Sequence, residues 1–233
     1  MATSMAEFLQ KQEEVYARFR HTIETVTREG FNPDPTFMEE RGGLFVVFRY
    51  PHAVTESLAR IAQSFAAQLP TGAAFAYDAT TIHTTLSDYQ VAAGYKPAEA
   101  LGIVETFNAF ARGVRNVVER SPHAARSCAV QFREMLWNRT TAIAAGIPNE
   151  EWFRFVQEIL RQWEERGVTL RHPWGAHATL ARIVRDVPSE ACTGLGELPR
   201  ALNLIATPDA IDVGWFTSTR ETFTRGVHET ILL

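Results

Sequence analysis

Residues 80–89 read TTIHTTLSDY, and residues 176–184 read AHATLARIV. Each stretch contains one His-x-Thr-Leu motif, which begins at His83 in the first and at His177 in the second. β-Branched and apolar residues dominate both stretches, so each is predicted to form a strand. Alternate side chains of a strand share a face, and the histidine and threonine of each motif are therefore expected to point to the same side.

The same order of elements precedes each motif. Leu44–Tyr50 is a short apolar run that favours a strand, and Thr55–Leu69 has apolar residues at helical spacing. Before the second motif, Met135–Ala145 favours a strand, and Glu150–Arg166 favours a helix with acidic residues at its start. A strand–helix–strand unit thus occurs twice, and the sequence predicts two similar lobes whose motif strands face each other.

Other segments complete the predicted order of elements. Ala6–Arg28 and Ala98–Arg120 have apolar residues at helical spacing, and Gly30 offers a stop to the first helix. Phe31–Arg41, which contains two prolines, is predicted to be a connector. The remaining predicted strands are Cys128–Arg133, Ala210–Thr217 and Val227–Leu232.

Composition limits the partners of the chain. Its 233 residues are 45% hydrophobic, which is enough for one globular unit with a substantial core. The net charge of −4 and the pI near 6.0 argue against tracking along nucleic acid, because such surfaces are usually strongly basic. A small nucleotide or an RNA end remains compatible with this charge, and the sequence leaves the oligomeric state open.

The N-terminus and the cysteines give further expectations. Met1–Gln10 lacks a basic stretch followed by an apolar core, and no apolar run approaches the roughly 20 residues that span a bilayer. Cys128 and Cys192 are far apart and lack metal-binding spacing, so neither a zinc site nor a disulfide framework is indicated. We expect a cytoplasmic protein that has no membrane partner and no cofactor.

Two imidazoles that face each other can divide the work of cleaving a phosphodiester. One can activate the attacking water or hydroxyl, and the other can protonate the leaving oxygen. Threonine hydroxyls can bind the non-bridging oxygens, so this chemistry needs no metal. The candidate catalytic residues are therefore His83, Thr85, His177 and Thr179.

The paired motifs resemble the defining feature of the 2H phosphoesterase superfamily, and especially its LigT-like branch of 2′,5′ RNA ligases and cyclic phosphodiesterases. The resemblance covers about Gly42 to Leu233. Gly43–Pro51 looks like the opening strand of the family, and Met135–Ile143 looks like the strand before its second-lobe helix. Residues 172–182 (HPWGAHATLAR) look like its second motif.

The resemblance implies an α+β fold of two pseudo-symmetric lobes, with antiparallel sheets flanked by helices around a central cleft. Residues 1–41 would form an N-terminal helical extension, and residues 42–233 would form the bilobal domain. The implied activity is metal-independent opening of 2′,3′-cyclic phosphates or handling of 2′,5′ linkages, with the four motif residues in the catalytic positions. Two departures bear on the substrate: the extension is longer than the family core requires, and Ser87-Asp88-Tyr89 replaces an apolar Phe-Leu-Gly ending.

Tyr89 and Trp174 are candidate substrate-binding residues. Tyr89 is expected on the same strand face as the first motif histidine, where it would stack on a base. Trp174 would either wall the cleft or anchor its loop. Arg182 has the opposite strand parity from the second motif histidine, which favours a structural or rim role. A surface or structural role is also favoured for Arg49, Arg139, His21, His52, His123, His172 and His228.

Two other functions fit the same residues. The histidine pair could cleave cyclic di- or oligonucleotide signals that offer a 2′-hydroxyl as nucleophile. Turnover of a cyclic dinucleotide but not of a nucleoside 2′,3′-cyclic phosphate would indicate this function. A non-catalytic RNA- or nucleotide-binding module is the alternative from another class, although intact His and Thr in both motifs argue against it.

Overall fold

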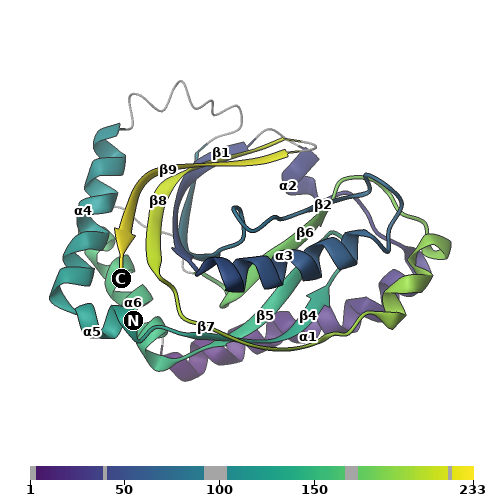
Figure 1. Cartoon of the computed structure of the whole chain (residues 1–233), viewed down its shortest axis with the longest axis horizontal. Helices are drawn as coiled ribbons and strands as arrows, with labels where there is room; N and C mark the ends of the chain where they lie inside the picture. The colour runs from purple at the N-terminus through teal and green to yellow at the C-terminus, as the bar shows by residue number, and fades with distance from the viewer. Residues whose placement is uncertain (1–3, 39–40, 92–103, 166–172, 220–221) are drawn as a thin grey trace.

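A computed structural model describes residues 4–38, 41–91, 104–165, 173–219 and 222–233. These ranges form one nine-stranded antiparallel sheet with helices packed around it (Figure 1). The helices are α1 (Met5–Glu29), α2 (Pro35–Met38), α3 (His52–Ala66), α4 (Val104–Arg120), α5 (Pro122–Arg126), α6 (Glu150–Glu164) and the 3-10 helix η2 (Ser189–Glu197). The strands are β1 (Arg41–Arg49), β2 (Ala74–Ala76), β3 (Thr84–Val91), β4 (Val130–Trp137), β5 (Thr141–Pro148), β6 (His177–Ile183), β7 (Ala201–Ala206), β8 (Ala210–Thr219) and β9 (Thr222–Leu232).

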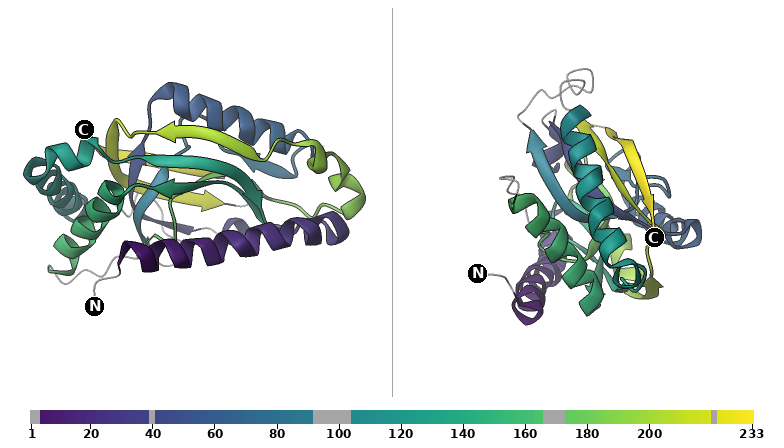
Figure 2. Two further views of the ribbon diagram at one scale, coloured as in Figure 1. Left: turned by 90° about the horizontal axis from the view of Figure 1, so that it is seen from below. Right: turned by 90° about the vertical axis from the view of Figure 1, so that its left-hand side faces the viewer.

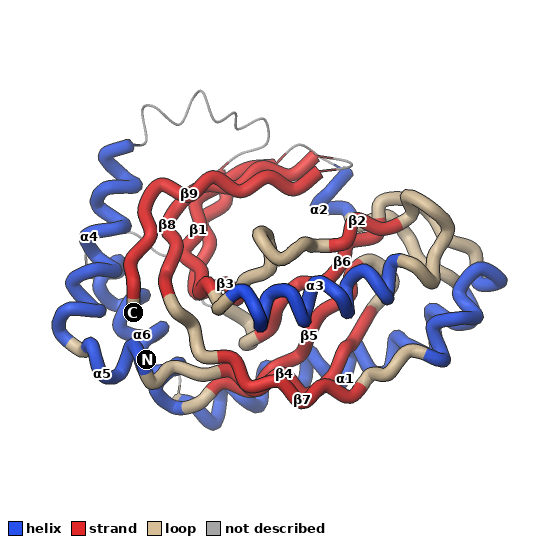
Figure 3. The backbone as a smooth tube through the Cα atoms, viewed as in Figure 1, coloured by secondary structure: helices blue, strands red, loops and turns tan. Residues whose placement is uncertain are grey.

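The sheet consists of two halves that meet at the motif strands. The strand order is β7-β4-β5-β6-β3-β1-β8-β9, and the short β2 also pairs with β6. The tube drawing shows these strands following one another around a strongly bent sheet (Figure 3). A single residue pair, Thr84 with Ala178, joins β3 to β6. The α+β fold with two similar antiparallel halves is therefore confirmed, and the halves share one continuous sheet.

Each half repeats one strand–helix–strand unit. In the first half this unit is β1–α3–β3, and in the second it is β5–α6–β6. The motif strand is the innermost strand of each half, and the first strand of the unit pairs beside it. The predicted internal repeat is confirmed, and it places the two motifs at the centre of the molecule.

The first helix has clear sequence-encoded ends. The Ser4 hydroxyl accepts a hydrogen bond from the Glu7 amide (3.2 Å), and the Glu7 carboxylate accepts one from the Ser4 amide (2.7 Å), which completes a capping box. Gly30 ends the helix at a φ of 75°, and a Cβ there would lie 2.0 Å from the Val187 carbonyl oxygen. The helix runs along the second half of the sheet (Figure 2).

The helix before the second motif encodes its own start and its buried face. The Asn149 side chain caps α6 by accepting from the Trp152 amide at 3.0 Å, and two glutamates follow in the first turn. Its apolar face lies in the main core, and the helices α4, α5 and α6 group at one end of the molecule (Figure 1). The fully buried aromatic side chains of α6 are Trp152 and Trp163.

The predicted boundary between two strands was wrong. The strand that was expected to end at Arg133 continues as β4 to Trp137, because the chain passes a register shift between Phe132 and Glu134 without leaving the sheet. The turn comes later, where the Asn138 side chain accepts from the Thr140 and Thr141 amides at 2.9 Å each.

Other elements also differ from the prediction. The expected connector contains α2, and β2, β7, α5 and η2 were not predicted, because short elements have little periodicity of their own. The first motif strand begins at Thr84 instead of Thr80, since the Asp78 carboxylate accepts from the Thr80 and Thr81 amides and holds a turn there. The expected start of the helix at Ala98 lies outside the described residues, which resume at position 104.

Candidate active site

The two motifs lie side by side at the junction of the halves. In the antiparallel pairing of β3 with β6, Thr84 lies opposite Ala178. One position to either side of this pair, the register brings His83 opposite Thr179 and Thr85 opposite His177. Each motif therefore supplies one histidine and one threonine to a common face. The antiparallel register relates the two motifs by a local twofold rotation.

The two imidazoles are held in the same way. His83 Nδ1 lies 2.6 Å from the Thr81 carbonyl oxygen, and His177 Nδ1 lies 3.2 Å from the Gly175 carbonyl oxygen. A carbonyl only accepts, so each Nδ1 carries the proton when the ring is neutral. Each Nε2 then has a free lone pair, which is the state that a general base needs.

The surroundings favour neutral rings in the free protein. Burial is the main cause that lowers the pKa of His83 to about 3, and the nearby Arg225 adds to this shift. Burial likewise lowers the pKa of His177 to about 4, although the bond to the Gly175 carbonyl acts in the opposite direction. Both rings remain half-buried, so a ligand can still reach them.

An aromatic ring flanks each imidazole. Trp174 stacks on His177 with ring centroids 3.9 Å apart and an angle of 22° between the planes. Phe223 lies parallel to His83 at a greater centroid distance of 6.3 Å. Trp174 is 38% exposed and lines a cavity, and its role in substrate binding stays a prediction.

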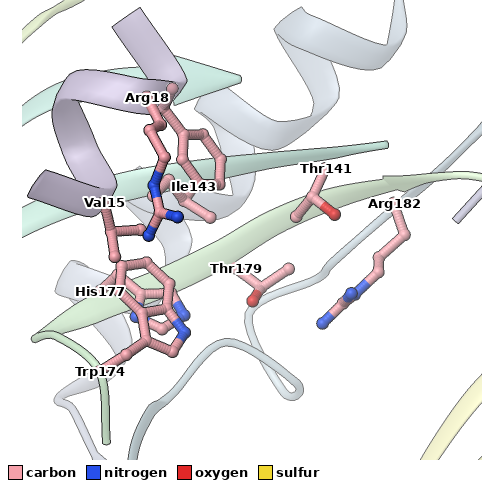
Figure 4. Close-up of a pocket in the computed structure, with 9 residues that line it drawn as sticks. Val15, Arg18, Thr141, Ile143, Trp174, His177, Thr179 and Arg182 are labelled. Atoms are coloured by element: carbon pink, nitrogen blue, oxygen red, sulfur yellow. The ribbon is translucent and has the colours of Figure 1, made fainter. Parts of the chain in front are cut away.

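A cavity of about 400 Å³ opens beside the second motif, which is a suitable size for a small ligand (Figure 4). His83 and Thr85, from the other half of the sheet, are not among its lining residues. Within the described part of the chain, the hydroxyls of Thr85 and Thr179 have no hydrogen-bond partner. The lining residues are Val15, Arg18, Phe19, Thr141, Ile143, Trp174, His177, Thr179 and Arg182.

The expected orientation of Arg182 was wrong. The pairing of β5 with β6 runs from Ile143 opposite Thr179 to Ala142 opposite Ala181, so Leu180 is an extra residue in the ladder. This bulge reverses the alternation of side chains and brings Arg182 to the same face as Thr179. Both residues line the cavity, and Figure 4 shows the guanidinium on the side of Thr179 that is away from His177. Strand parity read from the sequence missed this cation, because no residue type in the motif marks a bulge.

A buried carboxylate fixes Arg182 in place. The Asp34 side chain, of which 4% is exposed, forms an ion pair with Arg182 and accepts from the Thr141 hydroxyl at 3.0 Å. Burial by itself would favour the neutral acid, but Arg182 and Thr36 together hold the pKa of Asp34 below its usual value. Asp34 lies outside both motifs, and nothing in its local sequence pointed to the site.

A second bulge lies in the first motif. Val47 pairs with Thr85 and its neighbour Val46 pairs with Ser87, so Leu86 is the extra residue in β3. The alternation that placed Tyr89 on the face of Thr85 is therefore interrupted between them. The backbone of Tyr89 pairs with Leu44, and its side chain lies outside the described part of the structure, so its role stays a prediction.

Arg49 and Arg139 have the salt-bridged role that was favoured for them. Arg49 forms ion pairs with Asp209 and Asp212, and Arg139 forms one with Glu29. In the described ranges, no group of three or more His, Cys, Asp or Glu side chains is placed to hold a metal. His172 lies outside these ranges, and the exposed histidines are His21, His52, His123 and His228.

Comparison with solved structures gives the fold of the chain. TT0787 of Thermus thermophilus is 18% identical with a TM-score of 0.55, and the match covers 82% of this chain and 97% of TT0787. A phosphoesterase is 16% identical with a TM-score of 0.52, and the match covers 82% and 98%. The apo form of E. coli LigT is 17% identical with a TM-score of 0.50, and the match covers 83% and 98%.

At this level of identity the likeness concerns the fold. The chain has the fold of these three proteins, as the motif resemblance predicted. No protein-family model and no curated protein matches the chain by sequence. The described helices include none that is long and apolar enough to cross a membrane.

Proposed function

We propose that the chain is a metal-independent phosphodiesterase that opens 2′,3′-cyclic phosphates or cleaves 2′,5′ linkages in nucleotides or RNA ends. The observation that carries the proposal is the pairing of Thr84 with Ala178, which brings the histidine of each motif beside the threonine of the other. The shared fold with a phosphoesterase and with LigT adds support at the level of architecture.

The reaction can be written with the residues at the junction. One imidazole accepts a proton from water through Nε2 while the water oxygen forms a bond to phosphorus. The bond from phosphorus to one ribose oxygen breaks, and the second imidazole donates a proton to that oxygen. The hydroxyls of Thr85 and Thr179 donate to the non-bridging oxygens, and Arg182 stabilises their increasing negative charge.

Substrate binding supplies the protonation state that the reaction needs. In the free protein the low pKa values of His83 and His177 keep both rings neutral near pH 7. A phosphate bound between them brings negative charge, which raises the pKa of the adjacent histidine and favours its protonated form. One ring then acts as the acid, while the other stays neutral and acts as the base.

Turnover of a substrate panel in EDTA tests the proposal. The panel contains nucleoside 2′,3′-cyclic phosphates, 2′,5′-linked oligoadenylates and cyclic dinucleotides. We expect EDTA-resistant cleavage of the first or second group, and a loss of about 10²- to 10⁴-fold in His83→Ala and in His177→Ala. His21→Ala, which removes an exposed histidine, serves as the matched control and should retain full activity.

Other results would lead to different functions. Cleavage of cyclic dinucleotides alone would move the assignment to the degradation of such signals. Nucleotide binding without turnover, unchanged by His83→Ala, would indicate a binding module. Cleavage that is abolished by EDTA, or that is indifferent to both histidine substitutions, would exclude the two-histidine mechanism.

A further inference from the structure

The N-terminal helix is fixed directly against the second motif. The buried Tyr16 hydroxyl donates to the Ala176 carbonyl (3.0 Å) and accepts from the Gly146 amide (3.1 Å). The buried Gln12 carbonyl oxygen accepts from the Ala176 amide at 2.8 Å. A Cβ at Gly175 would come within 2.9 Å of the Gln12 side chain, so the helix and the loop before His177 are in close contact.

The same helix forms one wall of the cavity. Val15, Arg18 and Phe19 lie on one helical face at spacings of three and four residues, and all three line the cavity. Phe19 and Tyr16 also pack against Trp174, with centroid distances of 6.3 and 5.9 Å. The helix therefore supports the ring that stacks on the motif histidine.

Arg18 is the cation on this wall. Its side chain is exposed, and within the described part of the chain its guanidinium has neither an ion pair nor a hydrogen bond. The other pocket cation, Arg182, already forms an ion pair with Asp34, and Arg20 on the same helix pairs with Glu13 and Glu134. None of the described residues that line the cavity carries a carboxylate, so the charge of Arg18 is left for a ligand.

The two arginines lie at different ends of the cavity. Figure 4 shows Arg18 beside His177 and Trp174, and it shows Arg182 on the opposite side of Thr179. A phosphate that reacts between the motifs would lie close to Thr179 and Arg182, which line the same cavity. A cation on the far side of His177 is placed for an anionic group other than the reacting one, and guanidinium groups bind phosphate with paired hydrogen bonds.

We infer that Arg18 binds a second, unreacting phosphate of the substrate. The inference rests on the proposed function and adds a substrate class: nucleotides that carry a phosphate on the 5′ oxygen in addition to the reacting group. A free 5′-phosphorylated nucleoside 2′,3′-cyclic phosphate has this chemistry, and so does the terminal nucleotide of an RNA that ends in a cyclic phosphate.

The test compares two substrates that differ only in this group. We would measure kcat/KM for adenosine 2′,3′-cyclic phosphate and for its 5′-phosphorylated form, in wild type, Arg18→Gln and Arg28→Gln. Arg28 is exposed on the same helix and does not line the cavity, so it is the matched control. We expect wild type and Arg28→Gln to prefer the 5′-phosphorylated form by about tenfold to a hundredfold, and Arg18→Gln to lose this preference.

The outcomes separate this inference from the proposed function. An equal preference in wild type and in Arg18→Gln would overturn the subsite while leaving the activity intact. If wild type cleaves neither substrate, the cyclic-phosphate form of the proposed function fails, and the 2′,5′-linked substrates of the panel test the other form. The binding of adenosine 3′,5′-bisphosphate relative to adenosine 3′-phosphate then tests Arg18 without turnover. In that case, a loss of the preference for the bisphosphate in Arg18→Gln supports the subsite. An unchanged preference in Arg18→Gln overturns the subsite.

A third substrate distinguishes the two sources of the second phosphate. The dinucleotide ApA with a terminal 2′,3′-cyclic phosphate has a phosphodiester at the 5′ position, whereas the phosphorylated mononucleotide has a monoester there. Greater dependence on Arg18 for the dinucleotide would indicate RNA ends. Greater dependence for the monoester would indicate a free nucleotide, because its higher charge is then the recognised feature.

Discussion

The two motifs repeat the same backbone arrangement in different surroundings. Each histidine bonds through Nδ1 to the carbonyl two residues earlier, and each motif leucine is an extra residue in its ladder. Around His83, however, the aromatic neighbour is distant and Arg225 is close. Around His177, Trp174 is in direct stacking contact, and the N-terminal helix forms one wall of the adjacent cavity.

This difference in charged neighbours leads to a prediction of which histidine is the base and which is the acid. Burial is the largest of the causes that lower the pKa of His83. The nearby groups Arg225, His177 and Arg182 also lower it. For His177, Arg182 is the charged group that lowers the pKa, and Arg225 is not among the causes. We therefore expect His83 to remain neutral and act as the base in the opening of a cyclic phosphate, and His177 to take up a proton and act as the acid.

The largest expected effect tests this division of roles. An analogue in which sulfur replaces the leaving bridging oxygen needs no proton on its leaving group. His177→Ala should lose about 10²- to 10⁴-fold of its activity on the normal cyclic phosphate and recover most of it on the sulfur analogue. His83→Ala should remain inactive on both substrates. Recovery in His83→Ala instead would reverse the assignment, and kcat measured for both substrates decides between them.

Arg182 is expected to have the next largest effect. In the proposed reaction, Arg182→Gln removes a cation that would lie beside the reacting phosphate, so kcat/KM should decrease by about 10²- to 10³-fold. Because the change also leaves buried Asp34 unpaired, the double variant Arg182→Gln with Asp34→Asn should regain thermal stability but not activity. Arg139→Gln, which breaks an exposed ion pair with Glu29, is the control. Activity that returns with stability would show that Arg182 is structural.

The aromatic neighbours should differ in a smaller, measurable way. Trp174→Leu removes a ring that stacks on His177 at 3.9 Å, so KM should increase about tenfold through loss of an oriented imidazole and of a cavity wall. Phe223→Leu, at 6.3 Å from His83, should change KM much less. Steady-state kinetics of both variants measures the difference. Equal effects would show that the separation of the rings does not govern the orientation of the histidines.

The smallest expected effect is on stability. Both histidines have a pKa below the unfolded value near 6.5, so the unfolded chain binds more protons between that pH and about 4. The contribution of the two histidines to the free energy of unfolding is fully present above pH 6.5. It decreases as the pH falls, by at most about 1.4 kcal/mol per pH unit for each ring. Denaturant unfolding at pH 7, 6 and 5 should show a weaker pH dependence in His83→Gln and His177→Gln than in His21→Gln. An unchanged dependence would mean that the rings titrate normally.

Local patterns in the sequence were enough for much of the fold. The helices α1, α3 and α6 were predicted because apolar spacing, caps and breaking residues lie within a few positions of one another. The repeated motif also indicated that two similar units face each other, and the structure brings His83 beside Thr179 as that expectation requires. Short strands were missed because they have little periodicity of their own. The β4–β5 turn was misplaced because β4 stays in the sheet beyond a bulge that interrupts its alternation.

The sequence by itself determined the residue types of the candidate chemistry and the repeated units that carry them, because both are properties of nearby positions. Only the tertiary structure decided which other groups join them. Arg182 reaches the cavity through a bulge at Leu180, and Asp34 pairs with it from the distant segment before α2. Arg18, which is 177 − 18 = 159 residues before His177, reaches the cavity on the N-terminal helix. These contacts depend on strand register and helix docking, which are set by packing of the whole chain and leave no mark at the residues concerned.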